Sequence, residues 1–208
     1  MALTAEQRIE RCHIELMKHP QFVAYSGILM IGECKVLDQP ITACTNGKSV
    51  KYGRQFVDSL NDTDLRGVII HEAKHKMYRH LLTWKHLHKQ DPQRANMACD
   101  FVINLEIKDE SERSSQFITL PKGGLLDEQY RGLNSAEVFN LLPPQPNDDG
   151  GGGGFDEHDW EGAEQLTEQE KTELAKEIDQ AIRQGAILAG KVGGSVDRSF
   201  TDLMSARV

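Results

Sequence analysis

The residues His71-Glu72-Ala73-Lys74-His75 have the types and the spacing of a metal site on one turn of a helix. Two histidines four residues apart share a helix face, so both imidazoles can reach one ion. The glutamate between them would lie close to water held by that ion, where a carboxylate can accept a proton. This arrangement suits hydrolysis of an amide by water. The alternative is a solvated helix face that carries these three residues without any chemical role.

The residues around this motif predict a helix that positions it. Asn61-Asp62-Thr63-Asp64 supplies capping side chains and acidic residues for a helix start. An apolar stripe then recurs at three- and four-residue steps and comprises Leu65, Val68, Ile69, Ala73, Met77 and Leu81. A second stripe, rotated from the first, comprises His71, His75, Tyr78 and Leu82. We therefore expect the histidines to line the wall of a cleft and not to point into the main core.

A catalytic metal site also needs a third protein ligand and an open position for water. Asp100 is the candidate, because it lies within an apolar run at residues 95–104 that has helical periodicity. An unpaired carboxylate buried there would cost on the order of several kcal/mol, and coordination of a metal would remove that cost. The alternative for Asp100 is a buried carboxylate that caps a loop or forms an ion pair with Arg79 or Arg94.

His80 is a less suitable third ligand. In a continuous helix it lies nine residues after His71, on the opposite face. No glycine lies between His75 and His80 to break the helix. Tyr78 and His80 remain candidates for donating a hydrogen bond to the oxyanion that forms during hydrolysis.

Three further polar side chains could support or complete the site. Asn96 and Asn104 lie four residues to either side of Asp100, so they share its helix face and could orient the ligands. His158 belongs to a cluster of aromatic and acidic residues at 155–160. It could supply or cover a metal position, like a latch, or it could have a plain packing role.

Several stretches of the chain carry a resemblance to a known family. They are Thr42-Ala43-Cys44-Thr45-Asn46-Gly47, Val50-Lys51-Tyr52, Phe56-Val57, the run Leu65 to His75, His80, and Ala98-Cys99-Asp100-Phe101-Val102-Ile103-Asn104. These residues and their order resemble the bacterial metallopeptidase domain of the HExxH, zincin-like type, which usually lies N-terminal to a von Willebrand A-like domain.

The resemblance extends from the first predicted helix to about Trp160 and implies roles for the motif residues. His71 and His75 would be ligands of one Zn²⁺ ion, Asp100 the third ligand, and Glu72 the catalytic acid and base. The implied partners are a peptide or protein substrate, and an A-like domain or a MoxR-type ATPase.

Composition narrows the function classes. Hydrophobic residues make up 38% and charged residues 27% of 208 residues, as in a soluble globular protein. A net charge of −8 argues against nucleic acid as a partner, and no apolar run approaches the length of a membrane span. The N-terminus has the pattern of a capped helix and not of a signal peptide. The four cysteines are scattered without C-x-x-C pairing, which favours a reducing cytoplasm.

Basic residues accumulate around the motif: Lys74, Lys76, Arg79, Lys85, Lys89 and Arg94. They could form a solvated helix face. They could also form a rim that attracts acidic substrates or that pairs with the acidic segment nearer the C-terminus.

The chain divides into three regions by composition. Residues 1–142 are expected to form the zincin-like domain, residues 143–154 a Pro/Gly-rich flexible loop, and residues 155–208 an acidic segment with one helix that docks on the domain. Expected helices span residues 4–18, 135–142 and 167–188, each with recognisable start or stop signals. Residues 22–36 are interpreted as one or two short strands. Asn46-Gly47 predicts a type I′ hairpin between residues 41–45 and 49–52.

The sequence thus predicts an α+β, mainly helical, zincin-like domain with a small sheet or hairpin beside the motif helix. The expected function is a zinc metallopeptidase that hydrolyses peptide bonds by Glu-assisted attack of zinc-bound water. The alternative is a metal-stabilised binding or adaptor module without catalysis. A nuclease or deaminase is disfavoured, because the sequence lacks P-C-x-x-C and a carboxylate cluster for two metals.

Overall fold

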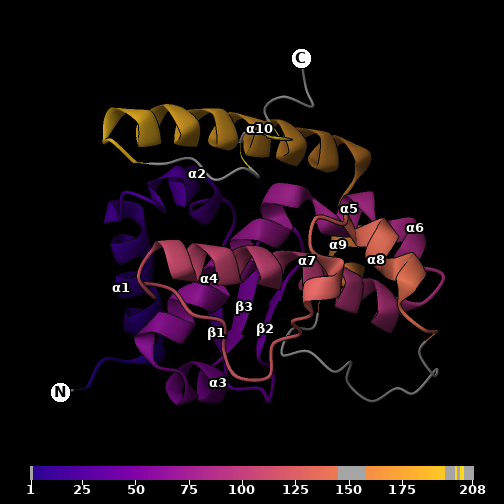
Figure 1. The fold of residues 1–208 in the computed structure, drawn as a ribbon, viewed down its shortest axis with the longest axis horizontal. Helices are drawn as coiled ribbons and strands as arrows, with labels where there is room; N and C mark the ends of the chain where they lie inside the picture. Colours follow the sequence, from indigo (N-terminus) through magenta and orange to yellow (C-terminus); the bar gives the residue numbers. More distant parts are fainter. Residues whose placement is uncertain (1, 145–157, 195–199, 201, 204–208) are drawn as a thin grey trace.

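Helix α4 (Asp62–Tyr78), which contains the metal-site motif, lies in the middle of a mainly helical chain, beside a three-stranded sheet (Figure 1). The structure is a computed structural model and describes residues 2–144, 158–194, 200 and 202–203. Around α4 are packed α1, α2, α5, α7, α10 and strand β2. The motif helix therefore contacts elements from the start, the middle and the end of the chain.

Among the described residues, three short strands lie between helices in the first part of the chain, and helices follow them. In chain order, the elements are α1 (Ala5–Lys18), η1 (Val23–Tyr25), α2 (Ser26–Leu29), β1 (Cys34–Leu37), β2 (Ala43–Thr45), β3 (Val50–Gly53), α3 (Arg54–Ser59), α4, α5 (His80–Thr83), α6 (Lys85–His88), α7 (Pro92–Arg113), η2 (Glu128–Tyr130), α8 (Ser135–Leu141), α9 (Trp160–Glu164) and α10 (Glu168–Lys191). The predicted mainly helical character with a small sheet is confirmed.

Capping residues fix the starts of the outer helices where the sequence predicts them. Thr4 caps α1 in a capping box with Gln7, and Thr167 caps α10 in a capping box with Glu170. Asn61 caps α4 by accepting a hydrogen bond from the backbone N–H of Asp64. The predicted helices at residues 4–18, 135–142 and 167–188 are confirmed within a few residues at their ends.

The strand prediction for residues 22–36 is wrong over most of its length. Residues 23–29 form the 3₁₀ helix η1 and the short helix α2, and only β1 is extended. Both helical pieces lie beneath α10, which runs along the top of Figure 1. Because this segment is apolar on nearly every side, its sequence shows no period that would distinguish a helix from a strand.

The sheet has the order β1-β3-β2, with β1 parallel and β2 antiparallel to β3. The predicted hairpin is present as β2 and β3, with Thr45 paired to Val50. The type I′ turn is not formed, because Gly47 has a φ of +86° whereas Asn46 is not among the residues of positive φ. Instead, Asn46 Oδ1 accepts hydrogen bonds from the backbone N–H groups of Lys48 and Ser49.

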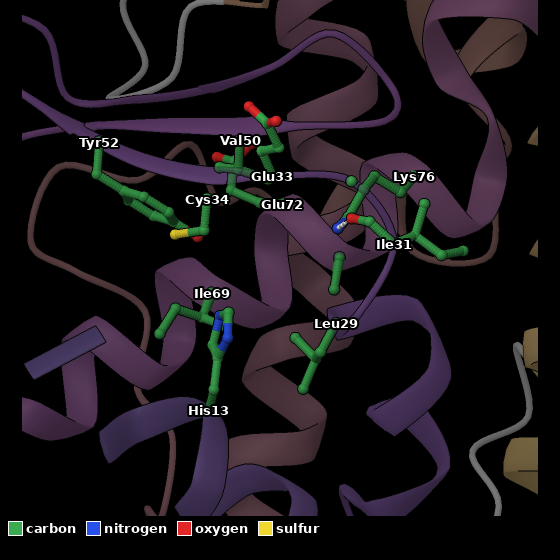
Figure 2. Close-up of a pocket in the computed structure, with 12 residues that line it drawn as sticks. His13, Leu29, Ile31, Glu33, Cys34, Val50, Tyr52, Ile69, Glu72 and Lys76 are labelled. Atoms are coloured by element: carbon green, nitrogen blue, oxygen red, sulfur yellow. Dashed lines mark hydrogen bonds between the residues drawn. The ribbon is translucent and has the colours of Figure 1, made fainter. Parts of the chain in front are cut away.

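Helix α4 is buried around its whole circumference, which differs from the predicted cleft wall. Every residue from Leu65 to Met77 is buried, including His71, Glu72 and His75. Helix α7 packs against the histidine face of α4, which the sequence predicts to be open to solvent. Strand β2 of the sheet packs against another face. A small cavity remains between α4 and the sheet, lined by Glu72, Lys76 and residues of β1 and β3 (Figure 2).

The predicted loop at residues 143–154 and the start of the predicted C-terminal segment lie mostly outside the described residues. The described part of the C-terminal segment contains α9 and α10. No helix among the described residues is long and apolar enough to cross a membrane.

We predict that Gly67→Ala destabilises the fold. A Cβ at Gly67 would lie 1.9 Å from the backbone oxygen of Thr119, so α4 and this segment would have to separate. Gly190→Ala in α10 is the matched control, because a Cβ there meets nothing within 4 Å. We expect it to stabilise by up to about 1 kcal/mol through helix propensity. Chemical denaturation of both variants is the measurement, and equal effects would contradict the close approach at Gly67.

Candidate metal centre

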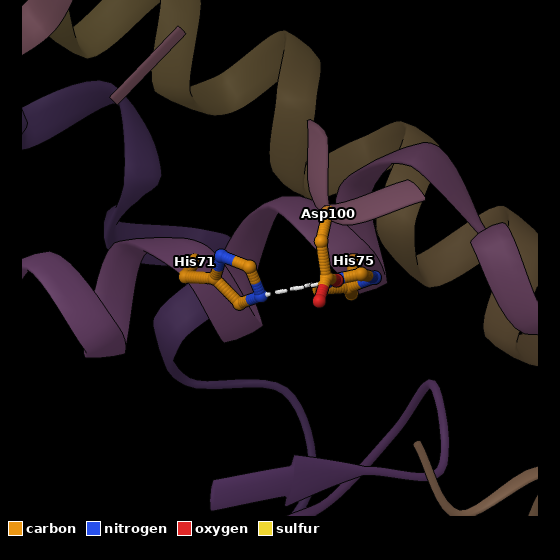
Figure 3. Close-up of side chains that lie close together, drawn as sticks. All are labelled: His71, His75 and Asp100. Carbon is orange, nitrogen blue, oxygen red and sulfur yellow. Dashed lines mark hydrogen bonds and ion pairs between the residues drawn. The ribbon is translucent and has the colours of Figure 1, made fainter. Parts of the chain in front are cut away.

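Helices α4 and α7 bring two imidazoles and one carboxylate into a single group, the metal group His71, His75 and Asp100 (Figure 3). Their ligand atoms all lie within 4.8 Å of one another. The two Nε2 atoms are 3.0 Å apart, and Asp100 Oδ1 lies 3.6 Å from that of His71 and 3.4 Å from that of His75. All three side chains are almost inaccessible to solvent.

These distances suit a metal ion. With bonds of about 2.0–2.2 Å, tetrahedral zinc holds its ligand atoms about 3.3–3.6 Å apart. Asp100 Oδ1 is buried and, among the described residues, has no hydrogen-bond donor. Such an oxygen is costly unless a cation faces it. The residues present therefore fit a divalent ion bound by two neutral imidazoles and one carboxylate.

A hydrogen bond from His71 to Asn104 sets the tautomer of that histidine. His71 Nδ1 lies 2.9 Å from Asn104 Oδ1. The Asn104 amide is oriented by its own Nδ2, which donates to the backbone oxygen of Leu125 at 2.9 Å. Because the amide oxygen faces His71, the proton must be on Nδ1, and Nε2 keeps its lone pair for a metal. The structure thus places Asn104 behind a predicted ligand.

His75 and His80 form a second imidazole pair, which the sequence did not indicate. Their Nδ1 atoms are 3.1 Å apart. The pKa of His75 lies well below its usual value, because burial and then the neighbouring His71 and His80 disfavour protonation. Burial, followed by His71, also lowers the pKa of His80 to about 3. Neutral imidazoles are the form that binds metals.

The prediction that His80 lies on the opposite face of a continuous helix is wrong. Helix α4 ends at Tyr78, and Arg79 adopts the left-handed conformation with a φ of 55°. This turn carries His80 back beside His75. Arg79 can hold the conformation because its guanidinium bonds Asp179 and the backbone oxygen of Ala175 in α10. No sequence signal predicts such a turn, since glycine usually occupies this position.

Glu72 faces the cavity between α4 and the sheet, together with Lys76 (Figure 2). The cavity has room for about one water molecule. Lys76 Nζ donates to the backbone oxygen of Ile31 at 3.0 Å. Burial lowers the pKa of Lys76 to about 8, although the negative charge of Glu72 acts in the opposite direction. A carboxylate and an ammonium group therefore share a small polar space one residue from a metal ligand.

Lys74 joins α4 to α7 on another face of the motif helix. Its Nζ lies 2.8 Å from Glu106 Oε2 and 3.0 Å from Glu110 Oε1, and it is fully buried. Burial alone would lower the pKa of Lys74, but the two carboxylates raise it well above the usual value. Tyr78 also hydrogen-bonds Glu106, so its hydroxyl is directed to this network.

The predicted solvated basic face is thus wrong for Lys74 and Lys76, which are buried. Arg79 and Lys85 instead pair with acidic residues of the C-terminal segment, Asp179 and Glu164. The predicted alternative for Asp100, an ion pair with Arg79 or Arg94, is not found: Arg79 binds Asp179, and the Arg94 guanidinium lies over the ring of Phe139.

The other predicted residues lie around the metal group. Asn96 Oδ1 accepts a hydrogen bond from Trp160 Nε1 at 2.7 Å, so Asn96 fixes a residue of the C-terminal segment. His158 is buried with its Nε2 3.1 Å from His75 Nε2 and 3.8 Å from Asp100 Oδ1. The structure therefore brings His158 against the metal group.

Comparison with known proteins agrees with a metal-dependent hydrolytic domain. Residues 5–208 match the family described as "Putative metallopeptidase domain". The chain belongs to this family. No curated protein and no solved structure matches it. Membership in the metallopeptidase-domain family, together with the group of two histidines and one aspartate, gives a metallopeptidase at family level with a candidate metal site.

We predict that His71→Ala and Asp100→Ala each abolish stoichiometric metal binding, because each removes one of three protein ligands. His86→Ala is the matched control, since His86 is an exposed histidine outside the metal group. Elemental mass spectrometry of chains purified without chelator measures metal per chain. Metal retained in Asp100→Ala would exclude this carboxylate as a ligand.

We predict that Asn104→Ala weakens metal binding by about 10–100-fold while the ligands stay in place. The variant removes the acceptor that fixes the His71 tautomer. Asn140→Ala, at an exposed position of α8, is the control. Titration against a chelating dye gives both affinities, and equal values would show that Asn104 does not orient His71.

Proposed function

We propose that this chain is a zinc-dependent peptidase with a zincin-like arrangement, in which the motif helix α4 lies beside a small sheet. The observation that carries the proposal is the metal group, in which α4 supplies two imidazoles and α7 one carboxylate at distances suited to a tetrahedral ion. Glu72, between the two histidines on α4, provides the carboxylate that such hydrolysis needs. Membership in the metallopeptidase-domain family supports the same reaction class.

Each residue then has a defined task. His71, His75 and Asp100 would hold one Zn²⁺, which supplies Lewis-acid activation of water and of the scissile carbonyl. Asn104 bonds His71 Nδ1 and would leave the Nε2 lone pair of His71 available to the ion. Glu72 would accept the proton of the attacking water and transfer it to the leaving amine. The cavity against Glu72 has room for about one water molecule, which this carboxylate could hold.

Lys76 lies beside Glu72 in the same cavity and could bind an oxygen atom of the substrate or of the attacking water. Tyr78 and His80 are the candidate donors to the oxyanion. We favour His80 of the two, because the Tyr78 hydroxyl bonds Glu106 whereas His80 lies against His75.

A second candidate function is a metal-stabilised binding module that cleaves nothing. The complete burial of the metal group favours it, since a structural metal site is closed and a catalytic one keeps an open position. Such a module would act together with an A-like domain or a MoxR-type ATPase, the partners that the sequence resemblance implies. The two functions differ in the role of Glu72, which is the catalytic base of a peptidase but has no catalytic role in a binding module.

We predict that Glu72→Gln keeps its metal and loses hydrolysis by at least about 100-fold, because the amide cannot accept a proton. The assay follows cleavage of a mixture of unstructured peptides by mass spectrometry, with metal content measured on the same samples. Glu173→Gln, an exposed residue of α10, is the matched control. Undiminished cleavage by Glu72→Gln would exclude Glu72 as the base.

A further inference from the structure

His158 places a third imidazole nitrogen against the metal group. Its Nε2 lies 3.1 Å from His75 Nε2, 2.8 Å from His75 Nδ1 and 3.8 Å from Asp100 Oδ1. The rings of His158 and His75 meet edge to face, with centroids 4.1 Å apart. The His158 side chain is completely buried. His158 Nε2 therefore lies next to His75 and Asp100, two of the three residues of the metal group.

The backbone next to His158 is bound to the edge of the sheet. The N–H of Asp159 donates to the backbone oxygen of Thr45, the last residue of β2, at 3.0 Å. Strand β2 is an edge strand of the described sheet. The Asp159 carboxylate also pairs with Lys51 of the neighbouring β3 at 2.8 Å. Extended peptides commonly pair with an exposed sheet edge in this manner, so the chain's own segment occupies a place that suits a substrate.

The segment His158–Glu164, which we call the strap, is anchored by contacts that do not involve the metal ligands. Trp160 donates to Asn96 and stacks on His88 with ring centroids 4.3 Å apart. Trp160 and Ala163 are buried together with Leu81. Glu164 pairs with Lys85 at 3.2 Å. These contacts hold the strap on α5, α6 and α7 without using any of the metal ligands.

With the strap in place, the metal group is inaccessible. The side chains of His75 and His158 are 0% exposed, that of His71 is 1% exposed and that of Asp100 is 4% exposed. A peptide bond could not approach these atoms. Three protein ligands and an open position are typical of a catalytic zinc site, whereas four protein ligands are typical of a closed one.

We propose that His158 is a fourth protein ligand of the metal, and that the strap closes the site in the position where substrate would bind. The inference rests on the proposed function, because it assigns a ligand of the same metal. Hydrolysis then requires release of the strap from β2 and from Asn96. The strap is thus an inhibitory segment supplied by the chain itself.

The test compares His158→Phe, His158→Ala and the control His86→Ala, all loaded with Co²⁺ and checked for folding by circular dichroism. Phenylalanine keeps a ring against His75 but offers no ligand atom, whereas alanine also opens space. Metal affinity is measured by competition with a chelating dye. Visible absorption of Co²⁺, which is stronger in four-coordinate than in five- or six-coordinate sites, is measured with and without acetohydroxamate.

We expect the wild type and His86→Ala to give the intense four-coordinate spectrum, unchanged by acetohydroxamate. His158→Phe should bind metal about 10-fold or more weakly and absorb less. His158→Ala should show the same loss and, in addition, a spectrum that acetohydroxamate changes. If the alanine variant also cleaves peptides faster than the wild type, the strap is inhibitory.

Two outcomes would overturn the inference in distinguishable ways. If His158→Phe has the same metal affinity and the same Co²⁺ spectrum as His86→Ala, then His158 covers the metal without binding it. The peptidase proposal would be unaffected by that result. Absence of stoichiometric metal from the wild type as well as from every variant would remove the proposed function and the fourth ligand together.

Discussion

Helix α4 is buried on every side from Leu65 to Met77 although six of these buried positions carry ionisable residues, and this constraint governs the arrangement of its neighbours. A charge or polar group that leaves water without a partner costs several kcal/mol. Neighbouring segments therefore supply partners for the buried charges of α4. Glu15 of α1 pairs with Arg66, and the backbone oxygen of Ile31 accepts a hydrogen bond from Lys76. Glu106 and Glu110 of α7 pair with Lys74. The metal group lies among these pairs.

The packing of α7 against α4 follows from this constraint. Asp100, Asn104 and the two glutamates lie on one helix and meet His71 and Lys74 on the other. A shift of α7 along α4 would break the hydrogen bond that sets the His71 tautomer and the buried ion pair at the same time. Two packed helices thus hold the ligand positions, which is the preorganisation that a tight site needs.

The sequence was sufficient to predict the structural features that depend on interactions between residues close together in the chain. Helix starts were predictable because Thr4, Asn61 and Thr167 have side chains that bond nearby backbone N–H groups. The proximity of Asp100 to the motif histidines was predictable because a carboxylate in an apolar helical run needs a partner. The structure places it beside both motif histidines.

Features that depend on distant residues could not be predicted. The left-handed turn at Arg79 is held by Asp179 in α10, so nothing near Arg79 reveals it. Residues 23–29 are helical because α10 covers them, and their apolar sequence fits either type of element. Burial of α4 on the histidine face likewise comes from α7 and the strap. Its own pattern of polar residues resembles that of a half-exposed helix.

The buried groups around α4 have a consequence for charge balance. Among the described residues, the buried or half-buried carboxylates of Glu72, Asp100, Glu106 and Glu110 lie at or around the motif, together with the buried ammonium groups of Lys74 and Lys76. Arg66 is already balanced by Glu15. Two formal negative charges thus remain in excess in a region of low dielectric constant. A single doubly charged cation would make this interior electrically neutral.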